Sequence, residues 1–250
     1  MDRFKEKVVL FTGAGDVTFA AAQRVLDEGG KIVLADYSLK ALEATFSDLT
    51  DKGYTADRIL CCPCDTRKKS DCDAVVHQAL NKWQRVDTLV STAGIIRHRP
   101  IEEMTDQEWQ DVIDVNLTGV FHSIQSVVPV MKKQNYGHIV VISSIGGRTG
   151  RPGVGVNYAA SKAGVNGMVI NLGYALAPWH ITVNSIAPGP LKGRMFQSMT
   201  EEQKKALADG IPLGRVGETN DIAAAIAYLG SDDASWTTGE VLDVNGGLQY

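Results

Sequence analysis

Tyr158 and Lys162 are the residues whose types and spacing most directly suggest chemistry. They lie four positions apart in the segment NYAASKAG, at the start of a stretch with a helical pattern. Residues i and i+4 project from the same face of a helix, so the ammonium group would lie close to the phenol. A nearby positive charge favours the phenolate and lowers the pKa of a tyrosine from about 10 toward neutrality. Such a tyrosine can exchange protons near neutral pH, although the same spacing is also common on ordinary solvated helix faces.

Two further polar residues stand where a proton-transfer site would need them. Ser144 follows the apolar run of VISSIGG, at the end of an expected strand, and Asn116 lies within the helical pattern of DVNLTGVF. Asparagine is unfavourable inside a helix unless its side chain has a role. The segments TAG and APG, residues 92–94 and 187–189, predict tight turns where backbone can approach a ligand.

The segment TGAGDVTF, residues 12–19, follows an apolar run and precedes a helical pattern. A strand that leads into a helix through a glycine turn can hold the pyrophosphate of a dinucleotide. Gly13 and Gly15 fit this use, but Val17 and Phe19 are bulky, and Val17 is poorly suited to a positive φ. Two interpretations stay open: a loop rebuilt around Gly13 and Gly15, or a scaffold that has lost its cofactor.

Asp36 favours the first interpretation. It ends the second apolar run, 23 residues after Gly13, where a carboxylate can bind the hydroxyls of a ribose. The same carboxylate would repel a 2′-phosphate, which predicts NAD(H) rather than NADP(H). The alternative is that Asp36 only caps the helix expected over the segment LKALEATF.

The elements that position these residues follow from seven short apolar runs separated by amphipathic stretches. Nearly continuous, β-branched runs are typical of strands covered on both faces by helices. We expect an α/β fold, with a Rossmann-like, doubly wound parallel sheet of about seven strands in a single domain over residues 1–250. The polar residues then fall at the carboxyl ends of the strands, where such sheets bind ligands. The runs are residues 7–13, 31–37, 58–65, 86–94, 137–144, 181–189 and 240–247.

Composition limits the functional classes. The chain has 250 residues, 44% hydrophobic and 22% charged, with a net charge of −4 and no long run of like charge. This argues against nucleic acid or an anionic membrane as a partner. Without a signal-like start or a long apolar window, we expect a cytoplasmic protein. The four cysteines crowd into residues 61–72, but adjacent residues of a strand point to opposite faces and the run reads as a buried strand, so we expect buried thiols and no metal.

Taken together, these motifs resemble the short-chain dehydrogenase/reductase family from about residue 5 to residue 247. The family's strand-end motif corresponds to STAG at residues 91–94, its PG motif to residues 188–189, and its last strand to TGEVLDVNGG. The family's catalytic tetrad maps onto Asn116, Ser144, Tyr158 and Lys162. Ser144 precedes Tyr158 by 14 residues, one more than in many members, and Ser143 is the less favoured alternative.

The resemblance implies hydride transfer between a nicotinamide and an alcohol or carbonyl carbon. Tyr158 would exchange the substrate proton, Ser144 would position the substrate oxygen, and Lys162 would assist Tyr158 and hold the nicotinamide ribose. Asn116 would fix a water that links Lys162 to solvent. The position where the family often has a threonine after the PG motif is Gly193 here. The cofactor-binding residues implied are Gly13, Gly15, Asp36, Asp65, Thr66, Ala93, Gly94, Tyr158, Lys162, Pro188 and Gly189.

The substrate pocket should lie between the segment after TAG and a helical lid at about residues 190–212. The AGIIR start of the first segment resembles members that act on sugar acids and polyols, so we expect a small anionic or polyhydroxylated substrate bound partly by Arg97 or Arg99, besides Ser144. The alternative enzyme is a 3-oxoacyl-thioester reductase whose basic rim meets an acidic carrier protein, although that role usually uses NADP(H). From the family we also expect a homotetramer. The candidate rim residues are Arg97, Arg99, Arg148, Arg151, Lys192 and Arg194.

Overall fold

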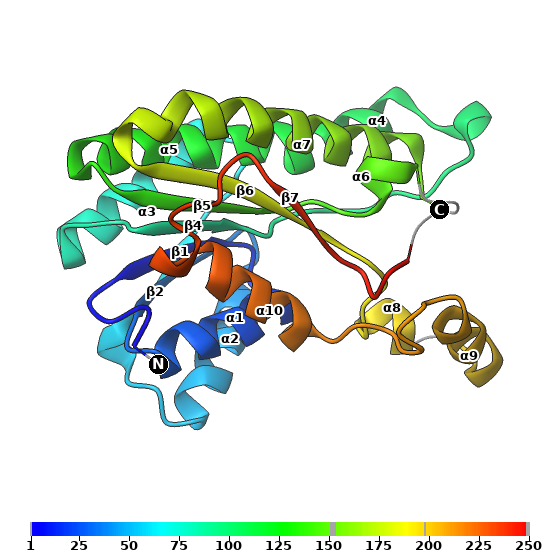
Figure 1. Cartoon of the computed structure of the whole chain (residues 1–250), viewed down its shortest axis with the longest axis horizontal. Coiled ribbons are helices and arrows are strands. Elements are labelled where there is room, and N and C mark those ends of the chain that lie inside the picture. The colour runs from blue at the N-terminus through cyan, green and yellow to red at the C-terminus, as the bar shows by residue number, and fades with distance from the viewer. Residues whose placement is uncertain (1, 151–153, 198, 249–250) are drawn as a thin grey trace.

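The computed structural model describes residues 2–150, 154–197 and 199–248, and its centre is a parallel sheet of seven strands (Figure 1). The strand order is β3-β2-β1-β4-β5-β6-β7, and every neighbouring pair is parallel. The order reverses direction between β1 and β4, which is where open α/β sheets bind ligands. The bounds are β1 Val8–Thr12, β2 Lys31–Asp36, β3 Ile59–Pro63, β4 Thr88–Ser91, β5 Gly137–Ile142, β6 Ile181–Pro188 and β7 Val241–Val244.

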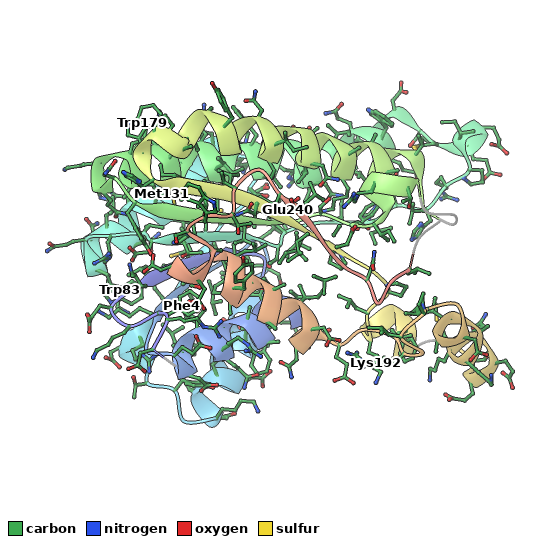
Figure 2. The ribbon with its side chains drawn as sticks, in the orientation of Figure 1. Phe4, Trp83, Met131, Trp179, Lys192 and Glu240 are labelled. Carbon is green, nitrogen blue, oxygen red and sulfur yellow. The ribbon has the colours of Figure 1, made fainter. Side chains whose placement is uncertain are left out.

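Helices cover both faces of the sheet, as the continuous burial of strands such as β1 and β6 requires (Figure 1). One apolar core lies under α1, α2 and α10, and the other under α3, α5 and α7. Phe4 belongs to the first core and Met131 to the second, and the two side chains lie on opposite sides of the sheet (Figure 2). The bounds are α1 Asp16–Asp27, α2 Leu39–Asp51, α3 Lys69–Trp83, α5 Gly119–Gln134, α7 Val156–Leu176 and α10 Thr219–Leu229.

The remaining helical segments lie near the carboxyl edge of the sheet or in connections. The helix α4, Asp106–Ile113, continues into α5 through a π-helical turn at Asp114–Thr118. The expected lid segment forms α8, Arg194–Gln197, and α9, Glu201–Asp209, which extend beside the sheet (Figure 1). The helix α6 spans Gly146–Thr149, and short 3₁₀ turns occur at Ala56–Arg58, Ile101–Glu103, Ala177–Trp179 and Asp232–Ala234.

The predicted fold class is therefore confirmed: a parallel sheet of seven strands between two helical layers. The cysteines are free thiols, and Cys62 in β3, Cys64 just after it and Cys72 in α3 are buried in the same apolar core. Among the described residues, no helix is both long and apolar enough to span a membrane.

Candidate functional site

A cavity of about 810 Å³ opens at the carboxyl ends of β1, β2, β3 and β4. Its walls come from the turn before α1, the ends of β2 and β3, the TAG turn and the start of the lid segment. The cavity thus lies at the reversal of strand order. The predicted residues in its walls are Gly13, Gly15, Asp36, Asp65, Thr66, Ala93, Gly94, Arg97 and Lys192.

Gly13 cannot be substituted without straining the turn before α1. Its φ is +94°, a conformation that L residues rarely adopt. A Cβ at this position would lie 2.8 Å from Thr92 Oγ1 and 3.0 Å from the Ala93 nitrogen. Gly15 is different, since its φ of −93° suits any residue and a Cβ would meet nothing within 4 Å. Space above Gly15 is what a pyrophosphate needs for close approach.

The bulky residues of the glycine loop do not distort it. Val17 and Phe19 both lie inside α1, with helical backbone, and pack against the core under that helix. The expected conflict between Val17 and a positive φ was therefore wrong, because the helix begins at Asp16, before Val17. The third position of the general glycine motif, Thr18, is buried and donates from Oγ1 to the Gly13 carbonyl at 2.7 Å. Thr18 thus stabilises the turn by a hydrogen bond, at the position where the general motif has a glycine.

The start of α1 fits an anion such as a pyrophosphate. Gly15 is its N-cap, and no side chain caps the helix. The first N–H groups of a helix have no intrahelical acceptor and carry a partial positive charge. These N–H groups belong to the first residues of α1, which line the cavity. The arrangement suits a dinucleotide held largely by backbone.

Asp36 is held at the end of β2 by two backbone bonds. Its Oδ2 accepts the Ala14 N–H at 2.7 Å, and its Oδ1 accepts the Ser38 N–H at 2.7 Å. The N-cap of α2 is Ser38, whose hydroxyl accepts the Ala41 N–H. The helix-cap alternative for Asp36 was therefore wrong. The half-buried carboxylate is fixed beside the α1 turn, on the cavity wall, as a ribose-binding group requires.

Asp65 and Thr66 form the cavity wall after β3. The Arg67 side chain bonds both carboxylate oxygens of Asp65, at 2.8 and 2.7 Å, and this pairing lowers the pKa of Asp65. Thr66 is buried, and its carbonyl contacts His122 Nδ1 at 3.0 Å. The end of β3 is therefore anchored to α5.

Lys162 lies in the interior, at the carboxyl end of β5. Its Nζ donates to the Ile142 carbonyl at 2.7 Å and lies 5.9 Å from the centre of the Tyr158 ring. Burial disfavours the ammonium form and lowers the pKa of Lys162 to about 8. Both residues come from the first two turns of α7, so the helix brings the predicted pair together.

Two serines follow β5, and their bonds separate their roles. Ser143 is buried and donates from Oγ to the Lys162 carbonyl at 3.3 Å, so it ties β5 to α7. The Ser144 hydroxyl accepts the Gly146 N–H at 3.1 Å. This arrangement favours Ser144 over Ser143 as the hydroxyl that serves the site.

Asn116 is fully buried in the π-helical turn between α4 and α5. Its Oδ1 accepts the Ile95 N–H at 2.8 Å, while its Nδ2 donates to the Ile95 carbonyl at 2.9 Å and to Ser161 Oγ at 3.2 Å. The side chain therefore joins the TAG turn to α7 by direct protein bonds. π-Helical turns inside helices are frequent at functional sites. A Cβ on Gly94 would lie 3.4 Å from Asn116 Oδ1 and 3.7 Å from Lys162 Nζ, so the cavity wall adjoins both residues.

Pro188 and Gly189 end β6 and do not line the cavity. The Pro188 carbonyl accepts the Ile145 N–H at 3.1 Å, which holds the Ser144 loop in place. A Cβ on Gly189 would lie 2.9 Å from Asn245 Cα, so this glycine allows the β6 end to pack against the residues after β7.

The expected basic rim is largely compensated by acidic neighbours. Arg99 pairs with Glu108 at 2.9 Å, away from the cavity wall, and Arg148 pairs with Asp243 at 2.8 Å. Lys192 lines the cavity, where the lid leaves the sheet (Figure 2), and pairs with Glu218 at 2.8 Å. Arg97 also lines the cavity and donates to the Ile96 carbonyl. Arg151 and the side chain of Arg194 lie outside the described residues.

Several cavity residues were not among those predicted. They include Tyr37, Arg67 and Asp111, together with Leu191 and Thr219 at the lid side. Tyr37 and Arg67 stand one and two positions beyond predicted strand-end residues, so extending each strand end by two positions would have found them. Asp111 and Thr219 lie on helices far away in the sequence, and no local pattern marks them.

Comparisons with known proteins agree with this geometry. A family model described as enoyl-(acyl carrier protein) reductase matches residues 14–249. The 3-oxoacyl-[acyl-carrier-protein] reductase FabG of Haemophilus influenzae is 38% identical over 243 residues, which cover 97% of this chain and 98% of that protein. The protein of the same name from Thermotoga maritima is 37% identical over 247 residues and covers 98% of this chain and 99% of its own.

Solved structures are similar over nearly the whole chain. Levodione reductase superposes with a TM-score of 0.91 and 34% identity, covering 98% of both chains. A 3-oxoacyl-[acyl-carrier protein] reductase from Brucella melitensis with bound NAD has a TM-score of 0.89 and 31% identity, covering 99% of this chain and 92% of the other.

Proposed function

Because the chain belongs to the short-chain dehydrogenase/reductase family, we propose that it is an NAD(H)-dependent oxidoreductase that interconverts a secondary alcohol and a ketone. One observation carries the proposal. Gly94 lines the cavity and adjoins both Asn116 and Lys162, so the proposed nucleotide site and the proposed proton-transfer residues would meet at one turn. A protein that only binds a nucleotide would not require proton-transfer residues beside the nucleotide.

The residues of the chain would supply proton transfer and orientation. The nicotinamide, when bound, would supply or accept the hydride. Tyr158 would give a proton to the substrate oxygen in reduction and take it back in oxidation. The Lys162 ammonium favours the phenolate form of Tyr158 through its charge. Ser144 would hold the substrate oxygen by a hydrogen bond, and Asn116 keeps the TAG turn against α7.

The cofactor would be bound by Gly13, Gly15, Asp36, Asp65, Thr66, Ala93 and Gly94 in the cavity wall, with Tyr158, Lys162, Pro188 and Gly189 toward the nicotinamide. NAD(H) is the proposed cofactor because the Asp36 carboxylate is fixed where the adenosine ribose would bind. The Arg67 guanidinium nearby is already paired with Asp65. A solved relative, the Brucella melitensis reductase, holds NAD.

For the substrate, we propose a 3-oxoacyl thioester as the first candidate. Support comes from the relatives at 37–38% identity, which are named 3-oxoacyl-[acyl-carrier-protein] reductases and match over almost their full length. The pairing of Arg99 and Lys192 with Glu108 and Glu218 leaves less bare positive charge for an acidic carrier protein than the sequence suggested. The thioester could therefore be accepted without strong carrier docking.

A second candidate is the small anionic or polyhydroxylated substrate expected from the sequence. Arg97 favours it, because it lines the cavity and, within the described part of the chain, forms no ion pair with a carboxylate. An arginine can bind a carboxylate through two charge-assisted hydrogen bonds.

Steady-state assays can separate the candidates. Oxidation of NADH and of NADPH would be followed with acetoacetyl-coenzyme A, and reduction of NAD⁺ with a panel of polyols, sugar acids and hydroxy acids. We expect NADH-dependent reduction of the thioester to exceed every other turnover. Faster turnover of a sugar acid or polyol would replace the first candidate by the second. If the protein binds no NADH, the scaffold interpretation holds instead.

Variants at the two arginines test the second candidate directly. For an acidic substrate, Arg97→Ala should lower kcat/KM by roughly 10- to 150-fold, since a hydrogen bond to a charged group contributes about 1.5–3 kcal/mol. Arg99→Ala is the matched control, because Arg99 already pairs with Glu108. An uncharged analogue should show little change in either variant. Equal losses for the charged and uncharged substrates would argue against Arg97 as the anion-binding residue.

We also propose that the protein is a homotetramer in the cytoplasm and needs no metal, nucleic acid or membrane partner. Exposed apolar side chains on α5 and α7 support self-association, namely Phe121, Val156, Ile170 and Tyr174. Light scattering after size-exclusion chromatography should give about four times the 27.0 kDa chain mass.

A further inference from the structure

Cys64 and Cys72 are two buried thiols that the proposed hydride transfer does not use. Cys64 follows β3 directly, and Cys72 lies in the first turn of α3, on the same side of the sheet. The Asp65 N–H donates to Asp71 Oδ2 at 3.1 Å, so the residues next to the two cysteines are already bonded to each other. The fold therefore holds the two thiols together at the junction of β3 and α3.

The two sulfurs are in direct contact through a hydrogen bond from the Cys64 thiol to the Cys72 sulfur. This bond lowers the pKa of Cys72, because the Cys64 S–H stabilises the Cys72 thiolate, and the same bond together with burial raises the pKa of Cys64. Cys72 Sγ also lies 3.9 Å from Ser123 Oγ and donates to the Thr66 carbonyl at 3.8 Å. The pair therefore releases its first proton as a unit, and the remaining proton lies between the two sulfurs.

Cys64 stands between two cavities. It lines the cavity of about 810 Å³ at the carboxyl ends of the strands, and it also lines a void of about 10 Å³ behind that wall. Cys72 and Ser123 line the void but not the larger cavity. A small solute in the larger cavity thus meets Cys64 first, with Cys72 directly behind it. A void of about this volume has room for one water molecule, so the sulfurs can shift without displacing their neighbours.

The other two cysteines are placed differently and serve as internal controls. Cys61 packs against the opposite core, under α1, α2 and α10, as the alternation of side chains along β3 requires. Cys62 lies on the same face as the pair, but its thiol donates to Gln78 Oε1 at 3.5 Å, and it lines neither of the two cavities. Burial raises the pKa of both thiols, that of Cys62 to about 11. Neither thiol therefore shares the features of the pair.

We propose that Cys64 and Cys72 form an oxidation site that hydrogen peroxide converts into a reversible disulfide. The Cys64 sulfur, having passed its proton to Cys72, attacks one peroxide oxygen; the O–O bond breaks, Cys64 becomes a sulfenic acid, and the leaving hydroxide takes up the proton that the pair released. The Cys72 sulfur then attacks the Cys64 sulfur, so that an S–S bond forms, the S–O bond breaks, and the second hydroxide leaves with the Cys72 proton as water. Two thiols and one peroxide become one disulfide and two waters.

The disulfide should weaken nucleotide binding at the neighbouring wall, and this part of the inference rests on the proposed function. Asp65 and Thr66 follow Cys64 directly and line the cavity. Oxidation removes the Cys72 S–H that donates to the Thr66 carbonyl, so this wall loses a hydrogen bond. We expect the dissociation constant of NADH to rise about fivefold, the usual effect of one neutral hydrogen bond. A bound nucleotide would in turn cover Cys64 and slow its oxidation.

Mass spectrometry of the folded protein after treatment with hydrogen peroxide tests the site. The parent should lose the mass of two hydrogen atoms, peptide mapping should join Cys64 to Cys72, and dithiothreitol should reverse the change. Cys61→Ser is the matched control and should form the same link. Cys72→Ser should form no link and should accumulate a Cys64 sulfenic acid that dimedone traps. Addition of oxygen to a single cysteine of the parent, a link through Cys61 or Cys62, or no reaction of the folded parent would overturn the site.

Binding measurements separate this inference from the proposed function. Saturating NAD⁺, which peroxide does not oxidise, should slow disulfide formation in proportion to the fraction of protein that it occupies. The oxidised parent should bind NADH about fivefold more weakly than the reduced parent, and dithiothreitol should restore the affinity. Equal NADH affinity in the two forms, or equal oxidation rates with and without bound NAD⁺, would overturn the link between the disulfide and the cavity. A parent that binds neither nucleotide would instead overturn the proposed function, while the mass measurements still decide the disulfide.

Discussion

Lys162 is the residue whose surroundings bear most directly on proton transfer. Its ammonium is buried and bonded to the Ile142 carbonyl, and burial lowers its pKa to about 8. The charge of this ammonium favours the phenolate form of Tyr158, whose ring centre lies 5.9 Å away. The same burial makes the charged form of Lys162 unfavourable in the folded chain, which lowers the free energy of unfolding.

This cost predicts a pH dependence of stability. The pKa of Lys162 is about 8 when folded, below the ordinary value of 10.5, so the unfolded chain binds more protons between these values. The cost is fully present below pH 8 and is relieved as the pH rises toward 10.5. Between pH 7 and pH 10, the free energy of unfolding of the parent should therefore rise by roughly 2–3 kcal/mol relative to that of Lys162→Met. Urea titrations of both proteins measure this difference, and parallel pH profiles would contradict it.

Tyr158→Phe removes the phenolic oxygen and keeps the ring. Loss of a general acid–base group lowers rates by about 10²–10⁴-fold, so kcat should fall by that range. The dissociation constant of NADH should change little, because the cavity walls around Gly13 and Asp36 are untouched. Stopped-flow turnover and fluorescence titration of NADH check the two parts. Near-parental turnover would show that another group transfers the proton.

Asp36→Asn tests cofactor choice. The amide retains an acceptor for one of the backbone bonds from Ala14 and Ser38 but removes the negative charge. Because the charge repels a 2′-phosphate, the preference for NADH over NADPH should shrink by at least about tenfold. Dissociation constants for both nucleotides in parent and variant give the ratio. Equal affinities in the parent would remove this role from Asp36.

At the scale of elements, the turn into α1, where the proposed dinucleotide would bind, keeps its shape although Val17 and Phe19 replace two of the family's glycines. Thr18 bonds the Gly13 carbonyl and contacts Thr92 Oγ1 at 2.7 Å, so hydroxyl groups hold the turn. Phe19 packs against the core from inside the helix, and Val17 both contacts that core and lines the cavity. Only the position with positive φ still demands a glycine.

The two glycines of this turn should therefore respond differently to substitution. Gly13→Ala forces a Cβ to within 2.8 Å of Thr92 Oγ1 at a φ of +94°. The conformational cost alone is about 1–2 kcal/mol, so Tm should fall by several degrees. Gly15→Val meets no protein atom, so Tm should be nearly unchanged while NADH binding weakens sharply. Thermal unfolding and NADH titration of both variants check the contrast, which a stable Gly13→Ala protein would contradict.

The strands and helices also show which features of the structure can be predicted from sequence patterns. Apolar runs at 7–13 and 181–189 predict buried strands because a parallel sheet leaves no polar face. The π-helical turn that buries Asn116 has no such signature, since it depends on bonds to Ile95 and Ser161 from distant segments. The ion pairs of Arg99 and Arg148 likewise depend on which acidic residue the fold brings near. Strand ends were predictable, and side-chain partners across elements were not.

At the scale of the whole molecule, ligand binding and folding should be coupled. A ligand that binds only the folded chain stabilises it by about 2.7 kcal/mol at 100 times its dissociation constant. For a chain of 250 residues this corresponds to a rise in Tm of roughly 5–10 °C. Thermal unfolding with and without NADH measures the shift, and Gly15→Val at the same NADH concentration is the control with little shift.

The uncapped start of α1 has a consequence beyond affinity. The N–H groups at this helix end have no acceptor within the helix, and a bound anion would accept them. The protein without nucleotide should therefore be less stable than the protein with nucleotide bound. Proteases act on transiently opened chains, so their access should fall as nucleotide occupancy rises. The amount of this protein in a cell would then follow the supply of the dinucleotide, and starvation for that nucleotide should shorten its half-life in a pulse-chase experiment.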